Sequence, residues 1–336
     1  MNSYTLTFRK KIVISSLLIL GILIILDIGL YFIANMKSTK TTFINDKFSK
    51  STHLKLNSLK KRDIIFVGSS RTFYHISTNT FKKNGLDIYN LGVSGAQFED
   101  YPTFIPYVNE ANPKQVVISL SVHRLFSELG ISAYPTVDEI SYYYDIDKIK
   151  FLESLKQWVV NRHLFLQYSE PIFYKIKSLY EKFESPKISN NQSLLTNNSI
   201  DYSKLVGCTV FDIKETTKSQ TTLKCTNGDG VLIGNHIESD KLDSAKKLEV
   251  LNQQSVEYLQ KIIGDIDVKD TKVSIILEPI LHNRYEYNID DIKKQFKGIR
   301  IIDLTNLKIE DSLWSDNGHL NYKGREEYSQ YLFEIF

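Results

Sequence analysis

The fold of this chain is constrained most strongly by five short apolar runs that alternate with segments of helical pattern. The first run, residues 64–67, contains only β-branched and aromatic side chains and ends at Gly68. Such a run is typical of a strand buried on both faces of a parallel sheet. The other runs predict strands at residues 87–91, 115–120, 273–277 and 299–302. This alternation indicates an α/β fold built on a central, doubly wound parallel sheet.

Helices are predicted between and after these strands. One covers residues 101–110, and another closes the chain at residues 322–333. A third covers residues 240–263, because its apolar residues recur at helical spacing and Ser239 and Asp240 provide an N-terminal cap. The alternation of strands and helices is therefore present on both sides of a long middle segment.

That middle segment follows a different pattern. Residues 138–183 are helical in pattern and rich in aromatic side chains, and residues 185–200 are rich in Ser and Asn. Two β-like runs then flank Cys208 and Cys225. We therefore interpret residues 138–235 as an insertion in the α/β domain, which could form a lid over its site.

An almost wholly apolar stretch at residues 12–33 predicts an N-terminal transmembrane anchor. Its helix would span roughly 33 Å, enough for a hydrocarbon core of about 30 Å. Asp27 lies near one end, where a charge is tolerated close to the lipid headgroups. A cleaved signal peptide is the competing interpretation, but the residues after Ile33 make a poor cleavage site. We therefore predict an uncleaved anchor in the lipid bilayer.

The charges beside this stretch predict its orientation. Three basic residues at positions 9–11 precede it, whereas two lysines after it weaken the asymmetry. The positive-inside rule then places residues 1–11 in the cytoplasm. Residues 34–60 are polar and are interpreted as a stalk, and residues 61–336 as an extracytoplasmic domain.

The two cysteines, Cys208 and Cys225, are predicted to form a disulfide. Both lie in the segment placed outside the membrane, where thiols oxidise. They sit on two β-like runs that a hairpin could bring together. Two unpaired buried cysteines are the alternative, because the register of such a hairpin is unknown from the sequence.

Composition and charge exclude several other functions. The net charge of +3 over 336 residues is too small to indicate a nucleic-acid partner. Cysteine and histidine residues show no zinc-site spacing. We therefore predict neither a metal nor a cofactor.

A candidate nucleophile lies directly after the first strand. Gly68 permits a tight turn, and Ser69, Ser70 and Arg71 continue it. A small hydroxyl residue at the carboxyl end of a central parallel strand lies where open α/β sheets bind ligands. The alternative is that these residues form only a strand-to-helix turn with a serine N-cap.

A candidate base lies near the other end of the chain. Asp316 and His319 are three residues apart, so on a turn both side chains fall on one side, and the carboxylate can orient the imidazole. An Asp and a His at this spacing, with no other signal, often occur by chance. Here Asp316 and His319 follow the last predicted strand, so sheet topology brings them to the same edge as Ser70. A serine together with an Asp and a His is chemically sufficient for acyl transfer.

These segments resemble the SGNH (GDSL-like) hydrolase superfamily over residues 63–123 and 272–333. Gly68-Ser69-Ser70 is similar to the first block of the family, with Ser69 in place of its usual Asp, and residues 90–95 are similar to the second block. Residues 316–319, Asp-Asn-Gly-His, are similar to the last block. The resemblance implies a three-layer, flavodoxin-like fold with a central parallel sheet.

The same resemblance implies residue roles. Ser70 would be the nucleophile, His319 the base and Asp316 its orienting carboxylate, while Ser70 and Gly95 would belong to the oxyanion hole. In the third block the family has an asparagine as an oxyanion donor, and here His123 appears at that position. A histidine N–H could replace it, or His123 could be an ordinary loop histidine without this role.

The Gly-Ser-Ser version with a single N-terminal span is similar to one branch of the family, which includes teichoic acid D-alanyl-transfer and alginate O-acetylation proteins. The resemblance implies a serine acyltransferase or esterase acting on cell-surface glycan beside a membrane-bound O-acyltransferase. Two alternatives stay open, because fold alone does not establish function. One is a non-catalytic polysaccharide-binding or assembly subunit, and the other a lipase-type esterase.

Overall fold

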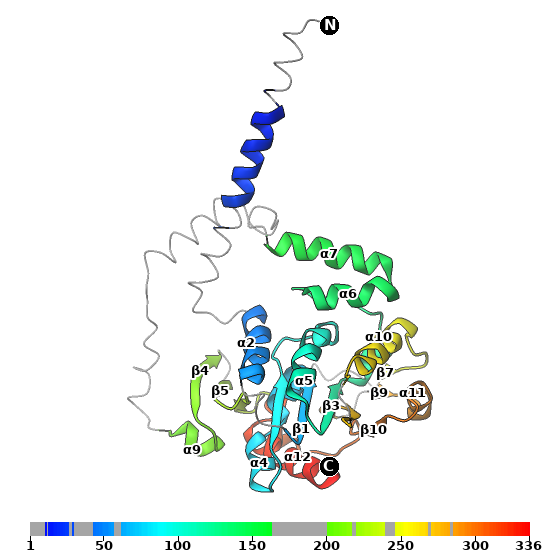
Figure 1. Cartoon of the computed structure of the whole chain (residues 1–336). Helices are drawn as coiled ribbons and strands as arrows, with labels where there is room; N and C mark the ends of the chain where they lie inside the picture. The colour runs from blue at the N-terminus through cyan, green and yellow to red at the C-terminus, as the bar shows by residue number, and fades with distance from the viewer. Residues whose placement is uncertain are drawn as a thin grey trace, which may run out of the picture.

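The computed structural model describes most of the chain after the N-terminal region, and Figure 1 shows its elements coloured along the sequence. The described residues are 11, 13–26, 29, 43–56, 62–162, 200–216, 220–238, 246–267, 270–282 and 285–336. Helices lie on both faces of a central sheet.

The central sheet has five strands, all paired in parallel. They are β1 (Ile64–Gly68), β2 (Ile88–Gly92), β3 (Gln115–Leu120), β8 (Lys272–Leu277) and β10 (Arg300–Asp303). Every residue of β1 and β2 is buried, which explains their unbroken apolar runs. The predicted α/β fold with a central parallel sheet is therefore confirmed, and it is consistent with a flavodoxin-like fold.

Two apolar cores fill the space between the sheet and its helices. Side chains of a strand alternate between faces, so Ile65 and Val67 enter one core while Ile64 and Phe66 enter the other. The first core includes residues of α5 (Ile105–Ala111), α10 (Gln253–Gly264) and α11 (Ile289–Gln295), and the second includes residues of α4 (Thr78–Lys83) and α12 (Tyr322–Ile335). The domain thus has three layers.

The strand order β10-β8-β3-β1-β2 contains a topological switch point. The chain runs from β1 to β2 on one side and then crosses to β3 on the other side of β1. The carboxyl ends of β1 and β3 therefore border the crevice in which open α/β sheets bind ligands.

Two predicted helices differ from the observed ones. Residues 101–110 are not one helix but a 3-10 helix, η1 (Phe98–Phe104), followed by α5. Pro106 lacks an N–H and its ring crowds the carbonyl four residues earlier, so a single α-helix cannot run through this segment.

The predicted helix over residues 240–263 is wrong for residues 246–252. Residues 246–252 are not helical: β7 (Lys246–Lys247) pairs in parallel with β9 (Tyr285–Glu286). The helix, α10, is capped by Asn252, whose side chain accepts from the Ser255 N–H. Residues 239–245, with the predicted cap, lie outside the described residues.

The stalk prediction is wrong for the residues of α2 (Phe43–Leu56), which pack into the domain. Lys47 is wholly buried and its Nζ lies 2.8 Å from Asp100 Oδ1 and 2.6 Å from Glu139 Oε1. Polar residues suggested a solvated segment, but a buried lysine is acceptable once it is paired in this way. The remainder of residues 34–60 lies outside the described residues.

The described part of the insertion contains helices and a second sheet. The helices are α6 (Val137–Ile146), α7 (Lys148–Arg162) and α9 (Tyr202–Val206). The antiparallel sheet consists of β4 (Val210–Thr216), β5 (Gln220–Cys225) and β6 (Gly230–Ile233). The predicted disulfide is present: Cys208 and Cys225 are bonded, with Cα atoms 5.9 Å apart. Residues 163–199 lie outside the described residues.

The predicted anchor at residues 12–33 is described only in part. Residues 13–26 are helical, while residues 12, 27, 28 and 30–33 lie outside the described set. Over the stretches for which coordinates are described, no helix combines the length and apolar character needed to cross a bilayer. The anchor and its orientation therefore stay predictions.

Candidate active site

Ser70 begins the helix that follows β1 at the switch point. This helix, α3, spans Ser70–His75, and Ser69 occupies the N-cap position without a side-chain capping hydrogen bond. Gly68 permits the close approach of α3 to the end of β1, because a Cβ at this position would lie 1.9 Å from Thr72 Oγ1. The serine hydroxyl therefore sits at the carboxyl end of a central strand, as the sequence predicts.

His319 lies in the loop that leads into α12. The Ser315 N–H donates to the His319 carbonyl at 2.7 Å, and Trp314 and Leu320 form an isolated antiparallel bridge. The Leu320 N–H donates to Nε2 of the buried His75 at 3.1 Å. These bonds fix the loop against α3.

The three predicted catalytic residues are brought together. His319 Nε2 lies 2.9 Å from Ser70 Oγ, and His319 Nδ1 lies 3.0 and 3.1 Å from the two oxygens of Asp316. This is the arrangement in which an imidazole accepts a proton from a serine hydroxyl while a carboxylate orients it.

Asp316 is held in its ionised form. Burial alone would raise the pKa of its carboxyl, but hydrogen bonds from His319, the Gly318 N–H and Gln220 outweigh that effect and hold the pKa well below its usual range. The Gly318 and His319 N–H groups both donate to Asp316 Oδ1, at 2.8 and 2.9 Å. The carboxylate is therefore both charged and fixed in direction at neutral pH.

Gly95 lies in the turn after β2, the strand beside β1. Its φ of 82° is in the left-handed region that favours glycine. Asn90 fastens this strand to α3, because its Nδ2 donates to the carbonyls of Thr72, Phe73 and Ile76 at 3.1–3.2 Å. The turn that carries Gly95 is therefore fixed relative to the helix that carries Ser70.

His123 lies just past the carboxyl end of β3, in the 3-10 helix η2 (Val122–Leu125). Its Nδ1 is 2.8 Å from Ser121 Oγ and its ring stacks on Tyr285. Burial, together with the nearby Arg124 and Arg71, lowers the pKa of His123 to about 4. The ring is therefore neutral at pH 7, with one N–H to donate and one nitrogen to accept.

A buried acid at the same sheet edge was not predicted from the sequence. Glu278 directly follows β8, and its Oε1 accepts from Thr72 and Ser119 at 3.1 and 2.9 Å. Burial raises the pKa of Glu278, and the nearby Arg71 opposes this rise. Arg71 Nη1 lies 3.8 Å from Glu278 Oε2, and its Nε donates to the Gly318 carbonyl at 3.3 Å. Glu278 could have been predicted as a site residue, because it lies at the carboxyl end of a predicted strand.

The insertion, which the sequence predicted only as a possible lid, also contacts the loop that carries Asp316 and His319. Gln220 begins β5, and its Nε2 donates to Asp316 Oδ2 at 3.2 Å and to Ser315 Oγ at 2.8 Å. The chain after β6 adds a bond from the His236 N–H to the Ser315 carbonyl at 2.7 Å. The described part of the insertion thus supports the acid of the triad, and no sequence spacing signals this contact.

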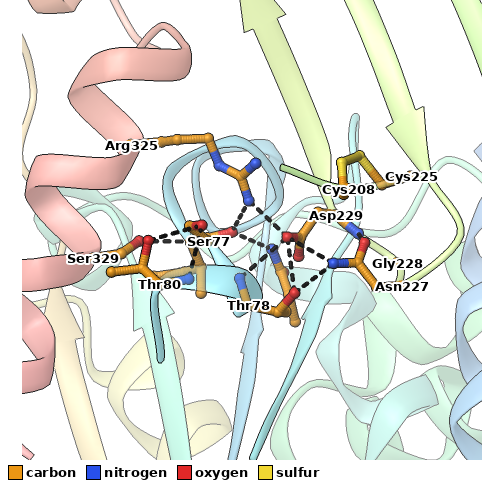
Figure 2. Close-up of polar contacts among 12 residues, drawn as sticks. Ser77, Thr78, Thr80, Cys208, Cys225, Asn227, Gly228, Asp229, Arg325 and Ser329 are labelled. Carbon is orange, nitrogen blue, oxygen red and sulfur yellow. Dashed lines mark hydrogen bonds and ion pairs between the residues drawn. A yellow bond between two sulfur atoms is a disulfide. The ribbon is translucent and has the colours of Figure 1, made fainter. Parts of the chain in front are cut away.

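A buried ion pair fastens the insertion to the domain. Asp229 and Arg325 are each 1% exposed, and Arg325 Nη2 lies 2.8 Å from Asp229 Oδ2. The same oxygen accepts from the Thr78 N–H and hydroxyl and from Asn227 Nδ2. Figure 2 shows this cluster between α12, the residues at the start of α4 and the β5–β6 turn, close to the disulfide. The hairpin that carries Gln220 is therefore tied to two helices of the domain.

The site is built from protein side chains without a metal-binding arrangement. Across the described ranges, no group of three or more His, Cys, Asp or Glu residues is placed to hold a metal ion. Comparison of the sequence with protein-family models and with curated proteins found no match. The geometry of the site is therefore the basis for the chemistry proposed for it.

Proposed function

We propose that this protein is a membrane-anchored serine esterase or O-acyltransferase of the SGNH type, acting on O-acyl groups of cell-envelope polysaccharide. The observation that supports it is the continuous hydrogen-bonded series from Ser70 Oγ through His319 to Asp316. Side chains from opposite ends of the domain, 249 residues apart in sequence for Ser70 and His319, meet here in the order that acyl transfer requires.

The reaction proceeds through an acyl-enzyme. Ser70 Oγ attacks the acyl carbonyl, and its proton passes to His319 Nε2 while Asp316 stabilises the imidazolium. When the tetrahedral intermediate collapses, the bond to the leaving group breaks and that group takes the proton from His319. Water or a sugar hydroxyl then attacks the acyl-serine by the same steps in reverse, which gives hydrolysis or transfer.

Backbone N–H groups stabilise the negative oxygen of the intermediate in this proposal. Ser70 and Gly95 supply two of them, and the neutral ring of His123 takes the place of the asparagine donor of the family. One such donor is typically worth ~10²–10³ in rate, so a chain that lacked it would still be a slow enzyme.

The cellular setting rests on the predicted anchor. With the domain outside, the acyl donor must be delivered through or at the membrane, and a membrane-bound O-acyltransferase is the proposed partner. The acceptor is then a cell-surface glycan. Nucleic acid is not a proposed partner, because the net charge is only +3.

Labelling with a serine-directed fluorophosphonate tests the proposal. The full-length chain should be labelled at Ser70, the Ser70→Ala variant should not be labelled, and the matched Ser69→Ala variant should be labelled like the parent. Labelling at Ser69, or none in the parent chain, would contradict the assignment of the nucleophile.

A non-catalytic polysaccharide-binding subunit on the same scaffold is the second candidate. The observation that favours it is His123, whose contacts with Ser121 and Tyr285 would also suit a purely structural loop histidine. The fluorophosphonate experiment separates the two candidates, because a binding subunit has no activated serine.

A further inference from the structure

A cavity of about 230 Å³ lies beside the candidate active site, between α2 and the insertion. One wall comes from α2 with Lys50, and another from the insertion with Phe211 and Lys224. The third wall is formed by Phe73 of α3 and by the turn after β2, including Ser94. Elements far apart in the sequence therefore enclose one space.

Tyr74 links one wall of this cavity to His319. The Tyr74 hydroxyl donates to Ser94 Oγ at 3.3 Å, and the Tyr74 ring packs edge-on against the His319 ring at 5.3 Å between centroids. Ser94 also precedes Gly95, the proposed oxyanion donor. The cavity wall at Ser94 is therefore connected to His319 through Tyr74, while Ser70 is not among the residues that line the cavity.

The polar groups of the cavity are balanced in charge. Lys224 Nζ lies 3.1 Å from Asp46 Oδ1, and Asp229 is paired with Arg325. Lys50 Nζ donates to the carbonyls of Asn90 and Gly228. Burial lowers the pKa of Lys50 to about 7, against the opposing charges of Asp229 and Asp46. Because these charged groups already have partners, the walls favour a neutral ligand over one with net charge.

An exposed aromatic ring stands at the edge of the cavity. The Phe211 side chain on β4 is 64% exposed although it lines the cavity. A second aromatic ring, Phe73, also lines the cavity, and Lys50 Nζ lies 4.9 Å from its centre. A sugar ring presents C–H groups on its faces and hydroxyls at its edge, so an aromatic platform beside hydrogen-bonding groups matches its two kinds of surface.

We propose that this cavity binds one neutral pyranose unit of the acceptor polymer, with Phe211 against the ring face and Lys50, Lys224 and Asp46 binding the hydroxyls. The unit next to it in the polymer then presents its hydroxyl to the acyl group on Ser70. The role as an acceptor subsite rests on the proposed function, whereas the binding of the sugar does not.

Saturation-transfer NMR with methyl β-D-glucopyranoside tests the binding directly. It uses the full-length Ser70→Ala chain in lipid nanodiscs, so that no acyl chemistry intervenes. Phe211→Ala should weaken binding at least tenfold. Phe48→Ala is the matched control, since Phe48 is 39% exposed and does not line the cavity, and it should change binding less than twofold. Unchanged binding in Phe211→Ala, or tighter binding of methyl β-D-glucuronide, would overturn the proposal.

Kinetics with 4-nitrophenyl acetate test the role in transfer. In a chain that retains Ser70, the nitrophenolate burst reports acylation, and added glucoside should then raise the steady-state rate. Phe211→Ala should lose most of the increase caused by the glucoside, whereas the matched Phe48→Ala variant should keep the increase seen in the parent chain. If the parent chain shows no burst, the proposed function fails, while the NMR result still decides the binding. If Phe211→Ala responds to the glucoside as the parent does, the cavity is not the acceptor subsite.

Discussion

The carboxyl edge of the parallel sheet and the insertion differ in how they contribute to the site. The sheet edge holds the bonded series of Ser70, His319 and Asp316, because Ser70 follows β1 and the other two residues follow β10 in the chain. The insertion supplies support through Gln220 and cavity walls through Phe211 and Lys224. Under the proposed function, the sheet edge therefore determines the reaction, and the insertion is the region that can adapt it to a substrate.

The largest expected effect is on the sheet edge itself. Ser70→Ala or His319→Ala should each reduce esterase turnover by on the order of 10⁴ or more, because the two groups act in one proton transfer. Adding His319→Ala to Ser70→Ala should lower turnover little further. Burst and steady-state rates with 4-nitrophenyl acetate measure this, and losses that multiply in the double variant would show that His319 is not the base for Ser70.

The next effect concerns the ion pair that joins the two regions. Arg325→Met should destabilise the chain by about 3–5 kcal/mol, because it leaves the Asp229 carboxylate buried without its partner. Asp229→Asn combined with Arg325→Met should be less harmful than the sum of the single changes. Urea unfolding of the full-length chain measures both.

A matched exposed pair provides the control for that comparison. Lys294→Met breaks an ion pair with Asp291 whose side chains are 69% and 45% exposed, and it should change stability by less than about 1 kcal/mol. An equal loss in Lys294→Met and Arg325→Met would contradict the argument from burial.

The disulfide should have a smaller effect, confined to the insertion. Replacing Cys208 and Cys225 by serine should lower stability by about 3 kcal/mol in the chain-entropy model, given their separation of 17 residues. Acylation of Ser70 should persist, since its triad lies on the sheet edge. Thermal unfolding and fluorophosphonate labelling measure the two quantities, and complete loss of labelling would show that the sheet edge depends on the disulfide.

Sequence reasoning succeeded where local pattern determines structure. The five strands are recognisable because buried parallel strands are short apolar runs, and strand topology then brings Ser70 and His319 to one edge. It failed where a residue's environment is set by a distant partner. The sequence around Lys47 indicates a solvated lysine, and only the structure shows that Lys47 is buried against Asp100 and Glu139.

Dependence on a distant partner also explains why Gln220 was not predicted to support Asp316. Gln220 has no motif of its own, and only the folding of β5 against residues 315–316 makes it part of the site. Glu278 differs, because it follows a predicted strand at the edge where Ser70 was placed, and that position was readable from the sequence. Support from a distant insertion therefore requires a structure, whereas support from the sheet edge does not.

The smallest expected effect on activity comes from Gln220, the residue of the insertion that contacts the sheet-edge residue Asp316. Gln220→Ala should reduce kcat/KM about tenfold, because it removes one hydrogen bond to the Asp316 carboxylate and loosens its aim at His319. Gln330→Ala, at an exposed position on α12, is the control and should leave kcat/KM unchanged. Equal values for both variants would show that the insertion does not support the triad.

The pH dependence of stability gives the same contact a second test. The folded-state pKa of Asp316 lies below its ordinary value of about 3.9, and Gln220 contributes to that depression. A depressed pKa adds stability that is present above the unfolded value and is lost as the pH falls through the folded value. Gln220→Ala should therefore be less stable than the parent near neutral pH, and the difference should shrink as the pH falls well below 4. A difference that stays constant on acidification would mean that Gln220 acts through packing and not through the Asp316 charge.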